Sequence, residues 1–257
     1  MGEQDVRQRS DAEEIRVFLR HLLKDVQAFE RMLEEDRFET GVRRIGAEQE
    51  LFLVDSFWRP APIATEVLEV VDDEHFTTEL ARFNLEFNLD PHIFGGTCLR
   101  DMEWQLGELL GKARAAAQSC GGDAVLTGIL PTLKKSDLEL INMTPNPRYY
   151  ALNEAMNRLK GGAYEFFLQG MDELHLHHDS IMVEACNASF QVHFQVGPEE
   201  FARIYNAAQA ITAPVVAAAT NSPLLFGKRL WWETRIGLFQ QSIDTRRTTP
   251  HLREQLP

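Results

Sequence analysis

The chain has 257 residues, 44% of them apolar, and its 26 basic and 39 acidic side chains give a formal net charge of -13. This size suffices for one large domain or two small ones, and we expect a single globular domain over residues 1–257. The acidic balance, without a cluster of lysines and arginines, argues against binding to nucleic acid or to an anionic membrane surface.

The cysteines and the N-terminal segment indicate the compartment. Cys98, Cys120 and Cys186 show no CxxC spacing, and the first residues, MGEQDVRQRSDAEE, are charged rather than a signal peptide. We therefore expect a reduced, cytoplasmic protein. The most apolar stretch, Ala207 to Thr220, is shorter than the roughly 20 apolar residues that span a bilayer, and we expect it to be a buried helix.

The first predicted element is an N-terminal helix over residues 10–36. Its apolar residues recur with the i, i+3, i+4, i+7 spacing of an amphipathic helix, and Ser10 or Asp11 can cap its first turn.

The stretch RIGAEQELFLVD, residues 44–55, predicts a β-strand with two acidic residues in an apolar setting. Positions i and i+2 of a strand lie about 6.6 Å apart on one side, so Glu48 and Glu50 share a face that Phe52 and Val54 continue. Two carboxylates that close repel each other unless water, hydrogen-bond donors or a cation separate them. We therefore expect positive charge at this face.

A loop at Arg59 and two prolines leads to a second strand, RFNLEFNLD, residues 82–90. A helix is expected from Leu99 to Gln118, ended by two glycines. Residues 124–132, AVLTGILPT, predict a short buried strand that ends at Pro131. The strand at 82–90 has an apolar face of Phe83, Leu85, Phe87 and Leu89 and a polar face of Asn84, Glu86, Asn88 and Asp90.

The stretch SFQVHFQVG, residues 189–197, predicts a third alternating strand, with Gln191, His193 and Gln195 on its polar face. A helix should begin at Pro198, and Pro214 should kink or divide it. Strands and helices follow each other without a strict βαβ rhythm. We therefore predict an α+β fold with a curved, largely antiparallel sheet backed by helices.

The polar faces of these strands have two interpretations. Antiparallel sheets often have one solvated face, yet these faces carry almost no lysine, arginine or threonine. Carboxylates suit Mg²⁺, and an imidazole in the shell is more typical of Mn²⁺. The pattern does not decide whether the polar residues of these faces contact solvent or bind a metal ion. These residues are Glu48, Glu50, Glu86, Asn88, His193 and Gln195.

Four motifs follow one another along the chain: GAEQE (46–50), FNLEFNLDP (83–91), NASFQVHFQVG (187–197) and AAATNSPLLFG (217–227). Together they resemble the motifs of the bacterial and plant glutamate-cysteine ligases and their carboxylate-amine ligase relatives. Four ordered motifs are far more specific than a lone G-x-E-x-E. The resemblance implies a catalytic fold of the glutamine-synthetase type, of which this chain would be the N-terminal portion with an open active site.

The resemblance also implies roles for single residues. Arg235 stands where the family has an arginine that holds a substrate carboxylate through its bidentate fork. Its setting, WWETR, departs from the family pattern, in which a serine shortly precedes the arginine. Asn221 would lie close to the substrate pocket. Lys228, which follows shortly after, is a candidate for contact with phosphates on its position and charge rather than on the resemblance. The implied metal ligands are Glu48, Glu50, Glu86 and His193.

The implied activity is ATP-dependent amide formation with Mg²⁺ or Mn²⁺. ATP phosphorylates a carboxylate, glutamate being our first expectation, and an amine then attacks the acyl phosphate. One alternative is an inactive nucleotide- or amino-acid-binding regulatory module on the same fold. Another is a structural domain with a wetted sheet face. We expect small-molecule partners, no nucleic acid and no membrane, and leave a homo-oligomer open.

Other features have a functional and a structural interpretation, and we favour the structural one for each. His175, His177 and His178 could bind zinc or face solvent. Cys186 could be a nucleophile or a buried thiol. Tryptophans 231 and 232 could stack on a base or pack, Lys228 and Arg229 could meet phosphates or be surface charge, and the glycines 161 and 162 could cradle phosphate or end a helix.

Overall fold

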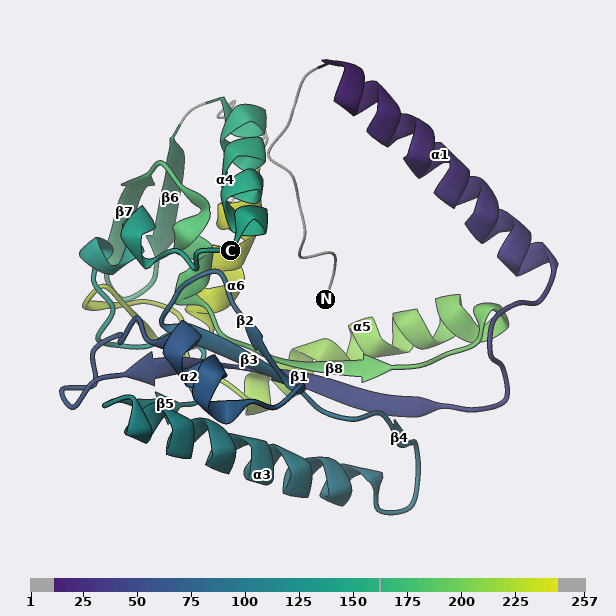
Figure 1. Cartoon of the computed structure of the whole chain (residues 1–257), viewed down its shortest axis with the longest axis horizontal. Coiled ribbons are helices and arrows are strands. Elements are labelled where there is room, and N and C mark those ends of the chain that lie inside the picture. Colours follow the sequence, from purple (N-terminus) through teal and green to yellow (C-terminus); the bar gives the residue numbers. More distant parts are fainter. Residues whose placement is uncertain (1–11, 162, 245–257) are drawn as a thin grey trace.

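The computed structural model describes residues 12–161 and 163–244 and has at its centre a six-stranded antiparallel sheet (Figure 1). The long strand β1 (Arg44–Val54) is its spine and pairs with four of the other five strands. This architecture confirms the predicted α+β class. The other strands are β2 (Phe76–Thr78), β3 (Asn84–Asn88), β4 (His92–Ile93), β5 (Asp123–Val125) and β8 (Phe190–Phe194).

Two hydrophobic cores lie on opposite faces of β1. Leu51 and Leu53 belong to one core, whereas Phe52 and Val54 belong to the other, because successive strand residues point to opposite faces. This explains why the end of β1 is apolar without interruption. Figure 1 shows α2 (Ala64–Val71) and α3 (Cys98–Ser119), which form the first core with the sheet, and on the other side the elements of the second core.

The second core lies on the face of β1 that carries Glu48 and Glu50. A two-stranded ribbon and several helical segments close it, so that part of this face is covered by protein rather than by solvent. These elements are α4 (Pro147–Lys160), β6 (Tyr164–Gln169), β7 (Glu173–His178), the 3₁₀ segment η3 (Ile181–Cys186) and α6 (Thr234–Ile243).

The remaining elements are short, except for the two helices α1 and α5. A tight hairpin, with Gly227 at a φ of 75°, connects two strands of two residues each. The elements are α1 (Ala12–Glu34), η1 (Lys135–Leu138), η2 (Leu140–Asn142), η4 (Pro198–Glu200), α5 (Phe201–Ala218), β9 (Leu224–Leu225) and β10 (Lys228–Arg229).

The N-terminal helix is confirmed as α1, although its expected cap at Ser10 or Asp11 lies outside the described residues. Figure 1 shows α1 projecting from the body of the fold. Its apolar side chains, among them Phe18, Val26 and Phe29, are accordingly exposed.

The expectation that residues 207–220 form a buried helix is half wrong. Residues 207–218 lie in α5, but no residue of this helix is buried, because none of the other elements in the described part of the chain covers it. Pro214 does not divide α5, which continues through it to Ala218. The described part of the chain also contains no helix with the length and apolarity that a bilayer crossing requires.

The expected strand at residues 124–132 is too long. Strand β5 ends at Val125, and Ile129 makes only an isolated bridge to Asn187. The reason is a turn in the chain, where the Thr127 hydroxyl donates to the carbonyls of Ile129 (3.1 Å) and Asn221 (3.4 Å). These apolar residues therefore reach the second core from a loop.

The other expected elements agree with the structure. The expected strand at 82–90 is β3, the expected helix at 99–118 is α3, and Gly121, at a φ of 82°, follows the end of that helix. The third expected strand is β8, but Phe190 and Val192 on its apolar side are exposed.

Candidate functional site

The register of the sheet brings acidic residues together on one face. Glu50 lies directly opposite Glu86 on β3, and Glu48 lies opposite Asn88. On the other side of β1, Gly46 lies opposite His193 of β8. Directly opposed residues of an antiparallel pair point to the same side of the sheet. Glu48, Glu50, Glu86 and His193 therefore share one face.

A third carboxylate completes a compact group that the sequence did not reveal. Glu79 follows the edge strand β2, and one side-chain oxygen each of Glu50, Glu79 and Glu86 lies within 4.8 Å of the others. We call these three residues the acid cluster. In the register Thr77 lies opposite Glu86, which brings the end of β2 to the same face.

Hydrogen-bond donors support the acid cluster, but within residues 12–161 and 163–244 no lysine or arginine forms an ion pair with it. The backbone N–H of Ser189 donates to Glu50 Oε2 at 2.7 Å, and the Gln191 amide donates to Glu50 Oε1 at 3.1 Å. The Asn88 amide donates to Glu86 Oε1 at 2.8 Å. The cluster is therefore oriented by neutral donors, and its negative charge is left uncompensated.

The environment penalises the ionised form of these carboxyl groups. Burial, and then the neighbouring carboxyl of Glu86, raise the pKa of Glu79 well above its usual value. Burial also raises the pKa of Glu50, against the hydrogen bonds that it accepts. Glu184 in η3 faces the same region, and burial together with the charge of Glu50 raises its pKa to about 7.

These groups fit a divalent cation. Carboxylate oxygens are the ligands that Mg²⁺ and Mn²⁺ prefer, and close acidic groups without basic partners must hold either protons or a cation. Glu48 and His193 form a separate pair on the same face, with Glu48 Oε1 3.2 Å from His193 Nε2. Glu48 is nearly buried, whereas the His193 side chain is 44% exposed, so this pair lies at the open side.

Arg235 at the start of α6 lies beside the acid cluster. Its Nη1 lies 3.4 Å from the carbonyl oxygen of Ala188, the residue before the Ser189 N–H that binds Glu50. The backbone N–H of Arg235 also lies 3.4 Å from the Ser222 hydroxyl. The structure thus brings Arg235 and the Asn221–Ser222 turn together, next to the segment that orients Glu50.

Lys228 does not join this group. It is exposed on the β9–β10 hairpin, and in the described part of the chain it forms no ion pair or hydrogen bond with the acid cluster. Its neighbour Arg229 pairs with Asp172 at 3.2 Å. For Arg229 the interpretation as paired surface charge is confirmed.

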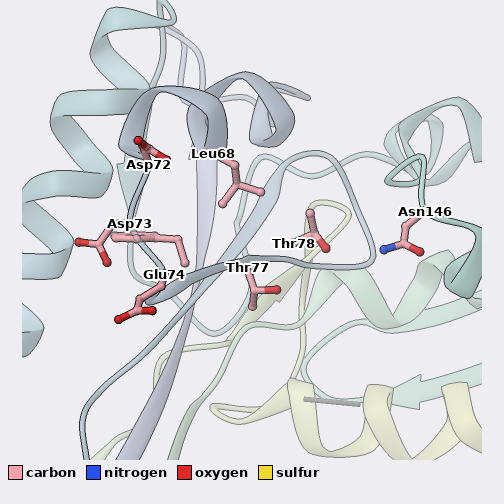
Figure 2. A pocket seen from close by; sticks show the side chains of 8 residues that line it. Leu68, Asp72, Asp73, Glu74, Thr77, Thr78 and Asn146 are labelled. Carbon is pink, nitrogen blue, oxygen red and sulfur yellow. The ribbon is translucent and has the colours of Figure 1, made fainter. Parts of the chain in front are cut away.

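A large open cavity of about 890 Å³ lies next to the acid cluster rather than around it. Figure 2 shows its lining, with Asp72, Asp73 and Glu74 before β2 and Asn146 across from them. The cavity reaches the sheet face that carries the acid cluster at Thr77, which lies opposite Glu86. Asp73 already pairs with Lys112 and His75, so Asp72 and Glu74 supply the remaining negative charge of this lining.

A comparison with models of protein families shows to which family this chain belongs. The model of glutamate-cysteine ligase family 2 matches residues 44–254. The chain belongs to glutamate-cysteine ligase family 2. A search of curated proteins finds no match to it. Membership in this ligase family fits the antiparallel α+β architecture, which is of the glutamine-synthetase type, and the match begins at the first residue of β1.

Most of the remaining motifs of this family member take the structural roles that we favoured. Trp232 does not, because it is 75% exposed rather than packed, and Gly162 lies outside the described residues. Cys186 is fully buried, and burial raises the pKa of its thiol. The Trp231 indole donates to the Gln169 carbonyl at 2.7 Å. Gly161 ends α4 in the left-handed conformation. His175 and His177 are exposed on β7, and in the described residues they belong to no group that could hold a metal.

Gly128 is another residue that sequence reasoning missed, and replacing it should have a measurable effect. A Cβ at this position would lie 2.2 Å from Asn221 Oδ1 and 3.2 Å from Arg235 Cδ. Gly128→Ala should therefore displace these side chains and lower the free energy of unfolding by about 1 to 3 kcal/mol, as measured by urea denaturation.

Gly111→Ala is the matched control, because it adds a Cβ at an exposed position of α3, where nothing lies within 4 Å of it. It should raise the free energy of unfolding by about 0.5 to 1 kcal/mol. Equal stability changes in the two variants would contradict the close packing of Gly128 against Asn221.

Proposed function

We propose that this chain carries the metal and substrate face of an ATP-dependent ligase that joins an amino-acid carboxylate, glutamate first, to an amine. The observation that supports this most is the β3–β1–β8 register, which collects Glu48, Glu50, Glu86 and His193 on one face. Family membership supports a carboxylate-amine ligase in general terms. ATP, the divalent cation and glutamate belong to our proposal.

The residues divide into two groups with different tasks. Glu50, Glu79 and Glu86 would hold a divalent cation, with Glu48 and His193 as further ligands at the open side. A cation bound there would neutralise charge on the phosphates of ATP. Arg235 would hold the carboxylate of the acid substrate, and Asn221 and Lys228 are the proposed contacts of the nucleotide.

A carboxylate is a poor electrophile and must be activated before an amine can attack it. In the proposed reaction a carboxylate oxygen of the acid takes the γ-phosphoryl group, and ADP leaves. The amine nitrogen then attacks the carbonyl carbon, phosphate leaves with the bonded oxygen, and the nitrogen loses a proton. The protein orients the reactants and needs no covalent nucleophile. The buried Cys186 thiol is consistent with this, because its raised pKa disfavours the thiolate.

The test is ADP release by the full chain with ATP, Mg²⁺ or Mn²⁺, glutamate and a panel of amines, with the product identified by mass spectrometry. We expect ADP release that requires both the acid and an amine. Calorimetric binding of ATP or an amino acid without ADP release would instead support a regulatory binding module. Absence of both would support a structural domain with a solvated sheet face.

A further inference from the structure

Glu233 is a buried acid that connects two of the residues in the proposed substrate site. Its side chain is 9% exposed. One carboxylate oxygen accepts a hydrogen bond from the backbone N–H of Asn221 at 2.8 Å, and the other accepts one from Arg235 Nε. A single carboxylate thus fixes the Asn221 turn and the Arg235 guanidinium relative to each other.

The backbone places Glu233 where it can make both contacts. Residues 222 and 233 form a parallel bridge, in which the Ser222 N–H donates to the Trp232 carbonyl at 3.1 Å and the Thr234 N–H donates to the Ser222 carbonyl at 3.3 Å. This bridge holds the Asn221–Ser222 turn against the first turn of α6. It would remain without the Glu233 side chain, so backbone attachment alone does not account for a buried carboxylate here.

The contact at Nε determines which edge of Arg235 is available. A guanidinium offers a carboxylate either the edge formed by Nε and one terminal nitrogen or the end formed by both terminal nitrogens. Glu233 occupies Nε, and the Arg235 side chain is 21% exposed. Nη1 donates one hydrogen bond to the Ala188 carbonyl at 3.4 Å. Its second hydrogen and those of Nη2 therefore remain for another carboxylate at the end of the guanidinium.

We propose that Glu233 is a positioning residue, which orients Arg235 so that both terminal nitrogens receive the carboxylate of the acid substrate end-on. This rests on the proposed ligase function, in which Arg235 binds that carboxylate. Glu233 also keeps the Asn221 turn at a fixed distance from Arg235, so the proposed nucleotide contact and the proposed acid contact keep one relative position.

Glu233→Gln tests this role with little change in shape. The Gln oxygen can still accept from Asn221 N–H, but its NH₂ group meets Arg235 Nε–H, so that two donors face each other. We expect the KM and the calorimetric Kd for the acid to rise about 10- to 100-fold, the range for supporting contacts of a site. The KM for ATP should change less than about 2-fold.

A double-mutant cycle with Arg235→Lys separates positioning from general stability. If Glu233 acts through Arg235, Glu233→Gln should add little to the loss in acid binding already caused by Arg235→Lys. Asp172→Asn is the matched control, because it breaks an acid–arginine pair with Arg229 on the nearby hairpin. It should leave acid binding unchanged.

The outcomes distinguish this proposal from the ligase function. Absence of ADP release in the wild type would defeat the ligase function alone, because acid binding by calorimetry still reports on Glu233. An unchanged Kd for the acid in Glu233→Gln, strictly additive losses in the cycle, or a wild type that binds no carboxylic acid would each overturn the role of Glu233. Thermal unfolding of every variant shows whether a loss follows from destabilisation.

Discussion

Replacing Glu50 and Glu86 together with Gln should abolish the binding of Mg²⁺ and at the same time stabilise the metal-free protein. The two residues face each other across β1 and β3, and their oxygens lie within 4.8 Å of each other and of Glu79. At an effective dielectric constant of about 20, two charges at that separation repel by about 3 kcal/mol. Since partial protonation relieves part of this, we expect a gain of about 1 to 3 kcal/mol.

Calorimetric titration with MgCl₂ and urea denaturation in EDTA measure the two effects. The double variant should show no binding heat, and its free energy of unfolding in EDTA should exceed that of the wild type. Glu165→Gln together with Glu173→Gln is the control, because both residues are exposed on the β6–β7 ribbon. Retained Mg²⁺ affinity in the cluster variant would contradict the proposed cation site.

Without a divalent cation, the protein should lose stability as the pH rises from about 4.5 to about 7. Burial and the charge of Glu50 raise the pKa of Glu184 from 4.5 to about 7. A carboxyl group with a raised pKa in the folded state makes its full contribution below the unfolded value. That contribution is lost as the pH rises through the folded value, because the unfolded chain then ionises more easily.

The expected loss from Glu184 alone is on the order of 3 kcal/mol between pH 4.5 and pH 7, with no further change from this group at higher pH. Glu50 and Glu79 act in the same direction, since burial also raises their pKa values. A bound divalent cation would favour the ionised forms. Saturating Mg²⁺ should therefore stabilise the protein more at pH 8 than at pH 5.

Urea denaturation at pH 5 and pH 8, with EDTA or with Mg²⁺, measures this dependence. Glu184→Gln should flatten the curve of unfolding free energy against pH, because Gln does not titrate. The same slope in Glu184→Gln and in the wild type would show that Glu184 ionises freely in the folded protein. A larger effect of Mg²⁺ at pH 5 than at pH 8 would count against coupling between the cation and these carboxyl groups.

Strand periodicity was sufficient to predict many of the residues on the sheet face that carries the acid cluster. Glu48 and Glu50 are two residues apart on a long strand, and Glu86 and His193 lie on strands with clear alternation. For these strands, the face of each side chain follows from the period of two. The sequence alone did not contain the register, and the register is what places Glu50 opposite Glu86.

Glu79, Glu184 and Glu233 escaped prediction because their segments have no readable period. Glu79 follows a strand of three residues, Glu184 lies in a 3₁₀ segment, and Glu233 precedes a helix. Each reaches the site through contacts distant in sequence, such as the parallel bridge at Ser222. The position of α5 was mispredicted for a related reason, since apolar composition does not show which element covers a helix.

Crystals of the protein soaked in MnCl₂, with the anomalous signal of manganese recorded, test the central claim most directly. The account predicts a peak about 2 Å from carboxylate oxygens of Glu50, Glu79 and Glu86, and loss of that peak in the Glu50→Gln, Glu86→Gln variant. A manganese peak elsewhere on the chain, with none among these three carboxylates, would contradict it.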